Sequence, residues 1–495
     1  MRASFCIPSS GLGNPKKFSG QGSAIIRCFA SKSLSFMLFG VPGLKRIAIA
    51  CVVCIVVSLV LVSCTGSGYG SSSSTTTGTT TTTTTTKPSG LAVRAFVSNP
   101  LFPSGSAGAF GSVLNIVDAT LDQLSFSYVN LTGASAHPGL MALSPNKKLM
   151  MVFSSTDDSI AVVNALSESQ SSNASGSFAA SVITLPGLTE SMVVGSDNVT
   201  AYAAVPTAPV TTGTSTPGAI AVMNLANISL TATIPVPASR YVVESHNGTR
   251  LLAFGEGSNV VTVIAPTSIG TAEDPRTPVC CFDHPAWAIF SSDDSKAYIL
   301  ECGPECGGTT AGISVLDLTA NPVSVTQTVP LAGAGATIGL VNGSTLYVAG
   351  TPPGTACPSG TAATTCGTLD IVDLGSMTVT SAMPIPITNG YHHRMEISNN
   401  GQLFVGATTC SNINNASEVR GCLSIFNTSN STVVIPPDNG DVTGIQPITN
   451  RNVVYLCEGG YFRIYDTTID KLQVPPAGQS SIVIVGDAVD VKLVD

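Results

Sequence analysis

Residues 313–350 read ISVLDLTANPVSVTQTVPLAGAGATIGLVNGSTLYVAG and contain two features that recur along the chain. The first is an apolar strand that ends in Asp317, and the second is an Asn-Gly turn followed by an aliphatic strand with Tyr347. Runs of β-branched and aromatic residues between Gly, Pro, Asn and Ser turns are typical of β-strands. This stretch therefore predicts short strands joined by tight turns.

The strand that ends in an acid or an amide recurs through the chain, with one copy in which Ala265 takes the last position. The other copies are LNIVD (Asp118), IAVVN (Asn164), IAVMN (Asn224), ISVLD (Asp317), LDIVD (Asp373), LSIFN (Asn427) and FRIYD (Asp466). Their spacing is about 50 residues, the size of a β-propeller blade. We interpret the acids and amides as turn caps, because such side chains accept backbone N–H groups of the following turn.

The second feature has the same period and the same count of eight. Its strands contain Phe96, Met151, Tyr202, Leu252, Tyr298, Tyr347, Phe404 and Tyr455. Two further apolar stretches per unit make four strands, so the sequence predicts an all-β fold with a single β-propeller of four-stranded blades. The repeats begin in mid-unit at Arg94 and end with SSIVIVGDAVDVKLVD. We therefore expect the C-terminal strand to close the ring beside the strand that begins near Arg94.

The order of strands and turns resembles that of YVTN-type propellers, which are related to the seven-bladed lactonase-like family. ISVLDLTANPV and NGSTLYVAG carry this resemblance, which extends loosely over residues 91–495. It implies a propeller fold and, as one alternative, a lactonase-like hydrolase. We count eight repeats, and seven blades stay open as an alternative. Trp287 is the only tryptophan, which argues against WD-repeat propellers and tryptophan-docked quinone propellers.

The charge distribution separates an N-terminal segment from the rest of the chain. Charged residues make up 10% of the chain, and residues 1–64 hold seven basic residues and no acidic ones. The remainder has 14 basic residues against 29 acidic ones. An acidic body of this kind does not bind phosphate backbones, so we expect no nucleic-acid partner.

The basic N-terminal segment has the pattern of an export signal. Lys45-Arg46 precedes the apolar run IAIACVVCIVVSLVL, and Leu61-Val62-Ser63-Cys64 resembles a bacterial lipobox. We expect a dispensable or mis-assigned extension at 1–36, a lipoprotein signal peptide at 37–63, the lipidation site Cys64 with a Ser/Thr-rich tether at 64–90, and the propeller at 91–495. The protein would then be exported and lipid-anchored in the cell envelope, in the outer membrane of a bacterium. A membrane-spanning anchor is the alternative.

Six cysteines bracket insertions at one position of three successive repeats. The pairs are Cys302 with Cys306, Cys357 with Cys366, and Cys410 with Cys422. Pairs at one repeated position predict disulfides that staple the hairpins in an oxidising compartment. Zinc at Cys302-x3-Cys306 is an alternative without a second ligand pair. The pairing of Cys280, Cys281 and Cys457 stays open, with a vicinal disulfide as one option for the first two.

Basic and imidazole side chains cluster just before the strands expected to line the centre of the ring. The candidate ligand-binding residues are His137, Arg240, His284, Tyr391, His392, His393 and Arg394. Such groups could bind an anionic or hydroxylated ligand, or a transition metal. The competing interpretation is that the His-Pro pairs only shape the turn that enters the strand. For catalysis the candidates are His393, Arg394 and Glu396, and no enzyme motif supports them.

These observations favour an envelope lipoprotein that binds a protein, a glycan or a small ligand without catalysis. A lactonase-like hydrolase and a structural subunit of an envelope assembly are the alternatives, and whether the protein is an enzyme stays open. We expect a monomer that contacts the membrane through its lipid and needs no cofactor or metal site. Loops with paired acids, such as Asp157-Asp158 and Asp293-Asp294, are candidate Ca²⁺ sites.

Overall fold

A computed structural model describes residues 88–495 except 104–109, 133–136, 173–180, 210–215, 334, 355–365, 382, 412–421, 438–439 and 476–477. The expected extension, signal peptide, lipidation site Cys64 and most of the tether lie outside the described residues. Within the described ranges, no helix is long and apolar enough to cross a membrane.

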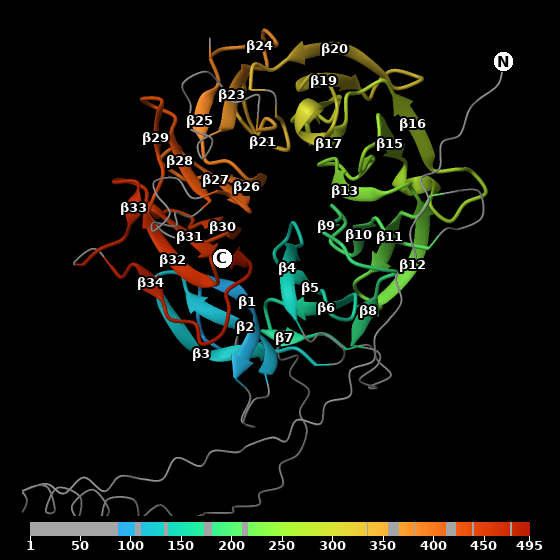
Figure 1. Cartoon of the computed structure of the whole chain (residues 1–495). Coiled ribbons are helices and arrows are strands. Elements are labelled where there is room, and N and C mark those ends of the chain that lie inside the picture. Colours follow the sequence, from blue (N-terminus) through green and yellow to red (C-terminus); the bar gives the residue numbers. More distant parts are fainter. Residues whose placement is uncertain are drawn as a thin grey trace, which may run out of the picture. The chain divides into compact units, whose positions relative to one another are not determined.

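The described residues form eight antiparallel sheets, which are the blades of a ring (Figure 1). The innermost strands, from blade 1 to blade 8, are β35 (Val491–Val494), β4 (Pro138–Leu143), β9 (Ser191–Val194), β13 (Ser239–Glu244), β17 (Pro285–Phe290), β21 (Ile338–Asn342), β26 (Tyr391–Ile397) and β30 (Val442–Pro447). The second strands are β1 (Arg94–Pro103), β5 (Leu149–Ser154), β10 (Thr200–Val205), β14 (Leu251–Gly255), β18 (Lys296–Glu301), β22 (Thr345–Gly350), β27 (Gln402–Thr408) and β31 (Val453–Glu458).

The outer half of each blade completes the four-stranded pattern. The third strands are β2 (Phe110–Asp118), β6 (Ser159–Asn164), β11 (Ala219–Asn224), β15 (Val260–Ile264), β19 (Gly312–Asp317), β23 (Gly367–Asp373), β28 (Leu423–Asn427) and β32 (Tyr461–Asp466). The continuous outer strands are β3 (Gln123–Asn130), β12 (Ser229–Pro235), β16 (Arg276–Cys280), β20 (Ser324–Pro330) and β29 (Thr432–Val434). In three blades the outer position is split between β7 (Ser169–Gln170) and β8 (Val182–Thr184), β24 (Thr378–Val379) and β25 (Ile385–Ile387), and β33 (Lys471–Leu472) and β34 (Ser481–Ile482). Two short 3-10 turns, η2 (Pro266–Ser268) and η3 (Gly303–Cys306), also occur among the described residues.

The predicted β-propeller is therefore confirmed, and the described residues contain eight blades, not seven. The predicted closure is confirmed as well, because β35 pairs with β1 in a register that places Arg94 opposite Val494 and Val97 opposite Val491. A terminal strand in this position leaves the first blade without an exposed inner edge.

Burial follows position within the blade. All residues of β31 are buried, because neighbouring blades cover both faces of the second strand. In the outer strand β3, by contrast, most residues are exposed to solvent. Hydrophobic clusters fill the spaces between blades, including the space between the last blade and the first. There, Tyr455 and Phe462 of blade 8 pack with Ala95 and Val97 of blade 1. The core is thus a series of interfaces between blades.

Antiparallel pairing places the loops that lead into the innermost strands and the loops between second and third strands on the same face of the ring. We call this face the upper face. The Asp and Asn turn caps follow the third strands on the opposite face. Asp317 Oδ1 accepts the Thr319 N–H at 2.8 Å, and Asn164 Oδ1 accepts the Leu166 N–H at 2.9 Å. The interpretation of these residues as turn caps is confirmed for both, and η2 follows Ala265 where the cap is missing.

Candidate functional site

A central channel of about 670 Å³ lies within the ring and is lined by residues from all eight blades. In five blades the pairing between the innermost and second strands slips by one residue near the upper face. In four of them the extra residue is Arg240, Ala286, His393 or Thr443, and in blade 2 it lies between Pro138 and Met141. Because a β-bulge re-aims a side chain, the same repeated position carries a guanidinium in blade 4 and an imidazole in blade 7.

Arg240 is neutralised by two carboxylates. Its Nε donates to Glu190 Oε2 at 2.9 Å, and its Nη1 lies 3.6 Å from Glu256 Oε1. The guanidinium also lies 5.1 Å from the ring centre of Tyr391. Burial disfavours the charge on Arg240, but the surrounding Tyr and Glu oxygens outweigh it and raise the pKa of the guanidinium. Arg240 is therefore a fixed cation whose charge is already satisfied.

Two tyrosines from non-adjacent blades meet where the channel opens toward the upper face. The hydroxyl groups of Tyr241 in blade 4 and Tyr391 in blade 7 share a hydrogen bond. Trp287 packs edge-on against Tyr241, with ring centres 5.6 Å apart. Burial raises the pKa of both phenols, so they stay neutral at physiological pH. The three rings give the channel an aromatic wall near its mouth.

Arg394 differs from Arg240 because no carboxylate pairs with it in the described part of the chain. Its Nε donates to the Thr443 carbonyl at 2.9 Å, and its Nη1 donates to the His393 carbonyl at 3.3 Å. The described residues provide no partner for Nη2. Arg394 is half-buried and lines the channel. It therefore presents a positive charge held in place by backbone carbonyls and not neutralised by an ion pair.

Two carboxylates share this part of the channel, in different states. Asp490 is buried, and both of its carboxylate oxygens already have partners. They accept the Met141 and Val491 N–H groups, each at 2.8 Å, and one of them lies 3.4 Å from Lys492 Nζ. Glu396 faces the channel and has no hydrogen-bond partner among the described residues. Enclosure by the surrounding strands raises the pKa of Glu396, and the nearby Lys492 and Arg394 limit that rise.

The structure separates the four candidate histidines. His393 lines the channel, and burial together with Arg394 lowers its pKa to about 4, so its imidazole is neutral at pH 7. His392 is fully buried outside the channel lining, and its Nε2 donates to the Thr388 carbonyl at 2.9 Å. The pairing slips by one residue between His392 and Arg394, so the regular alternation is broken there, and His393 and Arg394 both reach the channel while His392 does not. His284 lines a second pocket at the mouth, and His137 is in neither lining, with its backbone N–H bonded to Ser154 Oγ at 3.2 Å.

The second pocket, the mouth pocket, has a volume of about 340 Å³ and shares Arg240, Tyr241, Thr337 and Tyr391 with the channel. Glu305 reaches it from η3 of blade 5. Its Oε2 accepts the Thr351 N–H of blade 6 at 2.8 Å, and burial raises its pKa to about 8.

Glycines of blade 6 make room for this carboxyl. A Cβ at Gly335 or Gly350 would lie 2.6 or 2.7 Å from Glu305 Oε2, closer than side-chain atoms approach. Glu305 is thus a protonated carboxyl at neutral pH, seated between two blades at the channel mouth.

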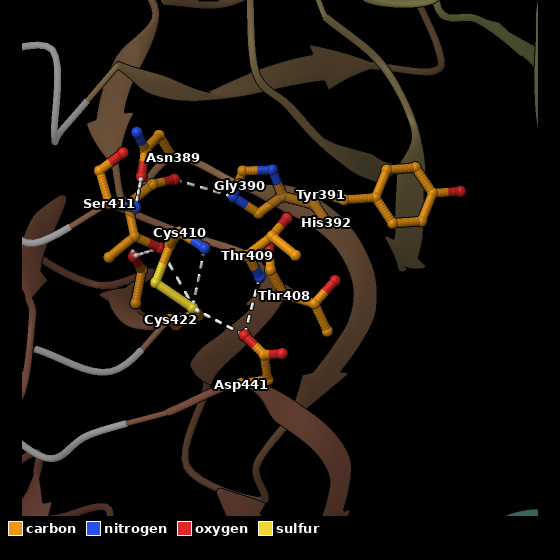
Figure 2. The surroundings of a disulfide bond; sticks show 12 residues. Asn389, Gly390, Tyr391, His392, Thr408, Thr409, Cys410, Ser411, Cys422 and Asp441 are labelled. Atoms are coloured by element: carbon orange, nitrogen blue, oxygen red, sulfur yellow. Dashed lines mark hydrogen bonds between the residues drawn. A yellow bond between two sulfur atoms is a disulfide. The ribbon is translucent and has the colours of Figure 1, made fainter. Parts of the chain in front are cut away.

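Disulfides hold the upper-face loops beside these residues. Cys302 pairs with Cys306 around η3, and Cys410 pairs with Cys422 in blade 7. Cys366 is also disulfide-bonded, while its expected partner Cys357 lies outside the described residues. Figure 2 shows Cys410–Cys422 beside His392, with the ring of Tyr391 pointing away from the disulfide. Two of the three predicted staples are therefore present as expected.

The candidate Ca²⁺ loops have local hydrogen-bond partners. Asp293 Oδ1 accepts from Ser291 Oγ at 2.7 Å and from Ser295 Oγ at 2.8 Å, and Asp157 Oδ1 accepts from Ser159 Oγ at 2.9 Å. No group of three or more His, Cys, Asp or Glu side chains is placed to hold a metal ion among the residues described.

Sequence reasoning missed several residues of the site. Glu190, Tyr241, Trp287, Glu305 and Lys492 come from four different blades, since Trp287 and Glu305 both belong to blade 5. None belongs to a motif, and their only common signal is a position near the start of an innermost strand or in a loop of the upper face. Repeat alignment followed by a search of those positions for charged and aromatic residues would have found most of them.

Comparison with known proteins identifies the fold and no closer relationship. No protein-family profile and no curated protein sequence matches the chain. Among solved structures, the dihydro-heme d1 dehydrogenase NirN in complex with DHE is 11% identical, with a TM-score of 0.53 over 81% of this chain and 75% of that one.

Two further solved structures have TM-scores below 0.5. The periplasmic gluconolactonase of Pseudomonas aeruginosa is 14% identical, with a TM-score of 0.44 over 81% of this chain and 99% of that one. The hydrazine synthase of Kuenenia stuttgartiensis is 12% identical, with a TM-score of 0.47 over 69% of this chain and 98% of that one. At these identities the likeness to NirN establishes that the chain has a β-propeller fold, and the site alone must carry the argument about function.

Proposed function

We propose that the protein is a non-catalytic binding module that holds a small carboxylate-bearing or otherwise anionic molecule in its central channel. The observation that carries this proposal is the contrast between two arginines of the channel. Arg240 is neutralised by Glu190 and Glu256, whereas Arg394 has no carboxylate partner among the described residues. An unpaired, partly desolvated guanidinium binds carboxylate or phosphate oxygens through charge-assisted hydrogen bonds.

The rest of the channel fits a ligand that also has hydroxyl groups or a ring face. Tyr241, Tyr391 and Trp287 offer aromatic surface near the mouth. His393, neutral at pH 7, can donate or accept a hydrogen bond beside Arg394. A volume of about 670 Å³ is the size of pockets that enclose small molecules.

A thermal unfolding screen of the full chain tests this proposal. The probes are succinate, gluconate, glucuronate and inorganic phosphate, with glucose as the uncharged control. A ligand present at 100 times its Kd stabilises a protein by about 2.7 kcal/mol, which is easily measured as an increase in Tm. At least one anion should raise the Tm while glucose does not. The proposal fails if glucose and the anions act alike.

A lactonase-like hydrolase is the second candidate, and Glu396 is the observation that favours it. A carboxylate with a raised pKa that faces the channel beside Arg394 could activate water, with the guanidinium stabilising the developing oxyanion. Turnover of glucono-1,5-lactone that disappears in Glu396→Gln would favour the hydrolase. Absence of turnover together with anion binding would favour the binding module.

The location of the module at the cell envelope is part of the proposal. Its support is the lipobox-like Leu61-Val62-Ser63-Cys64 and the Thr-rich tether that follows. Metabolic labelling with a radioactive fatty acid should label the chain, and Cys64→Ala should abolish the label while Cys54→Ala retains it. Equal labelling of both variants would contradict lipidation at Cys64.

A further inference from the structure

Two adjacent cysteines lie at the outer end of blade 4, apart from the disulfides already described. Cys280 is the last residue of β16, and Cys281 follows it with a φ of 83°, in the left-handed region that side chains other than glycine rarely adopt. Both side chains are exposed, and their Sγ atoms lie 2.7 Å apart. The backbone therefore already holds the two sulfur atoms in contact.

The other cysteines offer these two no alternative partner in the described part of the chain. Cys302, Cys306, Cys366, Cys410 and Cys422 are disulfide-bonded. Cys457 is fully buried in the core between blades 8 and 1. Cys280 and Cys281 are thus the exposed unpaired cysteines of the described residues, and each is the nearest partner of the other.

We propose that Cys280 and Cys281 are a reversible redox site that closes to a vicinal disulfide and reopens to two thiols. The oxidant is a low-molecular-weight disulfide such as oxidised glutathione. One protein thiolate attacks the oxidant and forms a mixed disulfide, and the second thiolate displaces the remaining oxidant thiol. One S–S bond breaks and one forms, both protein sulfurs are oxidised, and the two protons leave on two molecules of reduced thiol.

Covalent geometry makes this bond easier to reduce than the other disulfides. Adjacent Cα atoms are about 3.8 Å apart across a trans peptide, whereas ordinary disulfides span about 4.4–6.8 Å. A vicinal bridge must therefore distort its ring, and distorted or exposed disulfides are the labile ones. Cys302–Cys306 and Cys410–Cys422 have Cα atoms 5.7 and 5.6 Å apart, within the ordinary range.

The redox site is connected to the mouth pocket through a short, tightly bonded segment. The N–H groups of Cys281 and Phe282 both donate to the Asn259 carbonyl, at 3.2 and 3.3 Å. Asp283 Oδ2 accepts the Thr309 and Thr310 N–H groups at 2.8 and 2.7 Å.

The next residue, His284, lines the mouth pocket, and Trp287 follows it on β17. Closing or opening the bridge changes the turn at the start of this segment, so the emission of Trp287, the only tryptophan, reports on it.

Peptide mapping of the full chain in glutathione buffers of graded redox potential tests the proposal. Free thiols are blocked with N-ethylmaleimide, the protein is then reduced, and the released thiols receive a second label. Trypsin produces a peptide of residues 277–296, whose only cysteines are 280 and 281. We expect this peptide to contain an internal disulfide in oxidising buffers. Where it is half reduced, the Cys302–Cys306 and Cys410–Cys422 bonds should be about tenfold less reduced.

Trp287 fluorescence provides the second readout. Its emission should change at the same potential at which the peptide opens, and Cys281→Ser should abolish the change. Cys457→Ala is the matched control and should retain it.

The proposal is overturned if both cysteines react with N-ethylmaleimide in the most oxidising buffer or if the peptide is linked to another peptide. It is also overturned if the pair and the two ordinary disulfides open together. Because the mapping uses the unaltered chain and no ligand, its outcome is independent of the proposed binding function.

Discussion

Arg451 and Asp122 are 329 residues apart in the chain, yet they form a two-pronged ion pair across the junction of the last and first blades. Arg451 Nη1 and Nη2 donate to the two carboxylate oxygens of Asp122 at 2.6 and 2.7 Å. Tyr455 Oη donates to the same carboxylate. The Asp122 side chain is buried, so this contact joins the ends of the ring inside a hydrophobic interface.

We expect Asp122→Asn to lower the free energy of unfolding by about 2 kcal/mol. The substitution removes the charge that satisfies the Arg451 guanidinium, and hydrogen bonds to charged groups contribute about 1.5–3 kcal/mol. Urea denaturation measures the change. The matched control is Asp274→Asn, which removes an exposed Arg276 contact and should cost less than about 1 kcal/mol. Equal losses in the two variants would contradict a special role for the ring junction.

Closure by the C-terminal strand should depend on Leu493. This side chain is 4% exposed and packs in the interface between blades 8 and 1. Leu493→Ala should therefore cost about 2–5 kcal/mol, the usual range for a buried leucine. Val483→Ala, at a residue 78% exposed, should change stability little. Similar urea midpoints for Leu493→Ala and Val483→Ala would mean that β35 does not hold the ring closed.

Glu305 should give stability a measurable dependence on pH. Its pKa is about 8 in the folded protein, above the ordinary 4.5. The folded state therefore binds its proton more tightly than the unfolded state does. The stability that Glu305 contributes is fully present below about pH 4.5 and is lost as the pH rises through about 8.

Glu305→Gln should accordingly gain stability relative to the parent between pH 5 and pH 9, by on the order of 3 kcal/mol. Urea unfolding at several pH values measures the difference. Glu273→Gln, at an exposed acid, is the control and should follow the parent at every pH. If the free energies of unfolding of Glu305→Gln and of the parent depend on pH in the same way, the Glu305 carboxyl is ionised at neutral pH.

The fold can be predicted from the sequence because each blade repeats the same pattern of strands and turns. The turn caps Asp317 and Asn164 and the strand centres Tyr347 and Phe96 recur with one period, so their common physical roles can be inferred without a structure. The closing strand follows from the same counting. The bulges at Arg240 and His393 have no such signal, because a one-residue slip in pairing depends on contacts between strands.

The site is less predictable from the sequence, because it too depends on contacts between residues that are far apart in the chain. Arg240 and Arg394 look equivalent in the sequence, but Glu190 and Glu256 come from neighbouring positions of the ring and neutralise only Arg240. His392 and His393 are adjacent, and only His393 reaches the channel. Long-range geometry decides both distinctions.

Glu396 should weaken anion binding in the parent protein. Its carboxylate lies near Arg394 and repels a bound anion when ionised, and its pKa is raised, so binding should strengthen as the pH falls through that pKa. Glu396→Gln should bind an anionic ligand several-fold more tightly at pH 8, and its affinity should vary less with pH. Calorimetric titration at pH 5.5 to 8 measures both effects. Loss of binding in Glu396→Gln would show that the carboxylate helps to hold the ligand.

Calorimetric titration of Arg394→Gln with the best anion from the thermal screen tests the central claim most directly. Arg394→Gln keeps a polar side chain and removes the unpaired charge, so the affinity should fall about 10- to 100-fold relative to the parent. The control Arg250→Gln removes an arginine whose guanidinium, among the described residues, bonds only to the adjacent Thr249 carbonyl, and it should bind like the parent. Unchanged affinity in Arg394→Gln, or equal losses in both variants, would contradict an anion site at Arg394 in the channel.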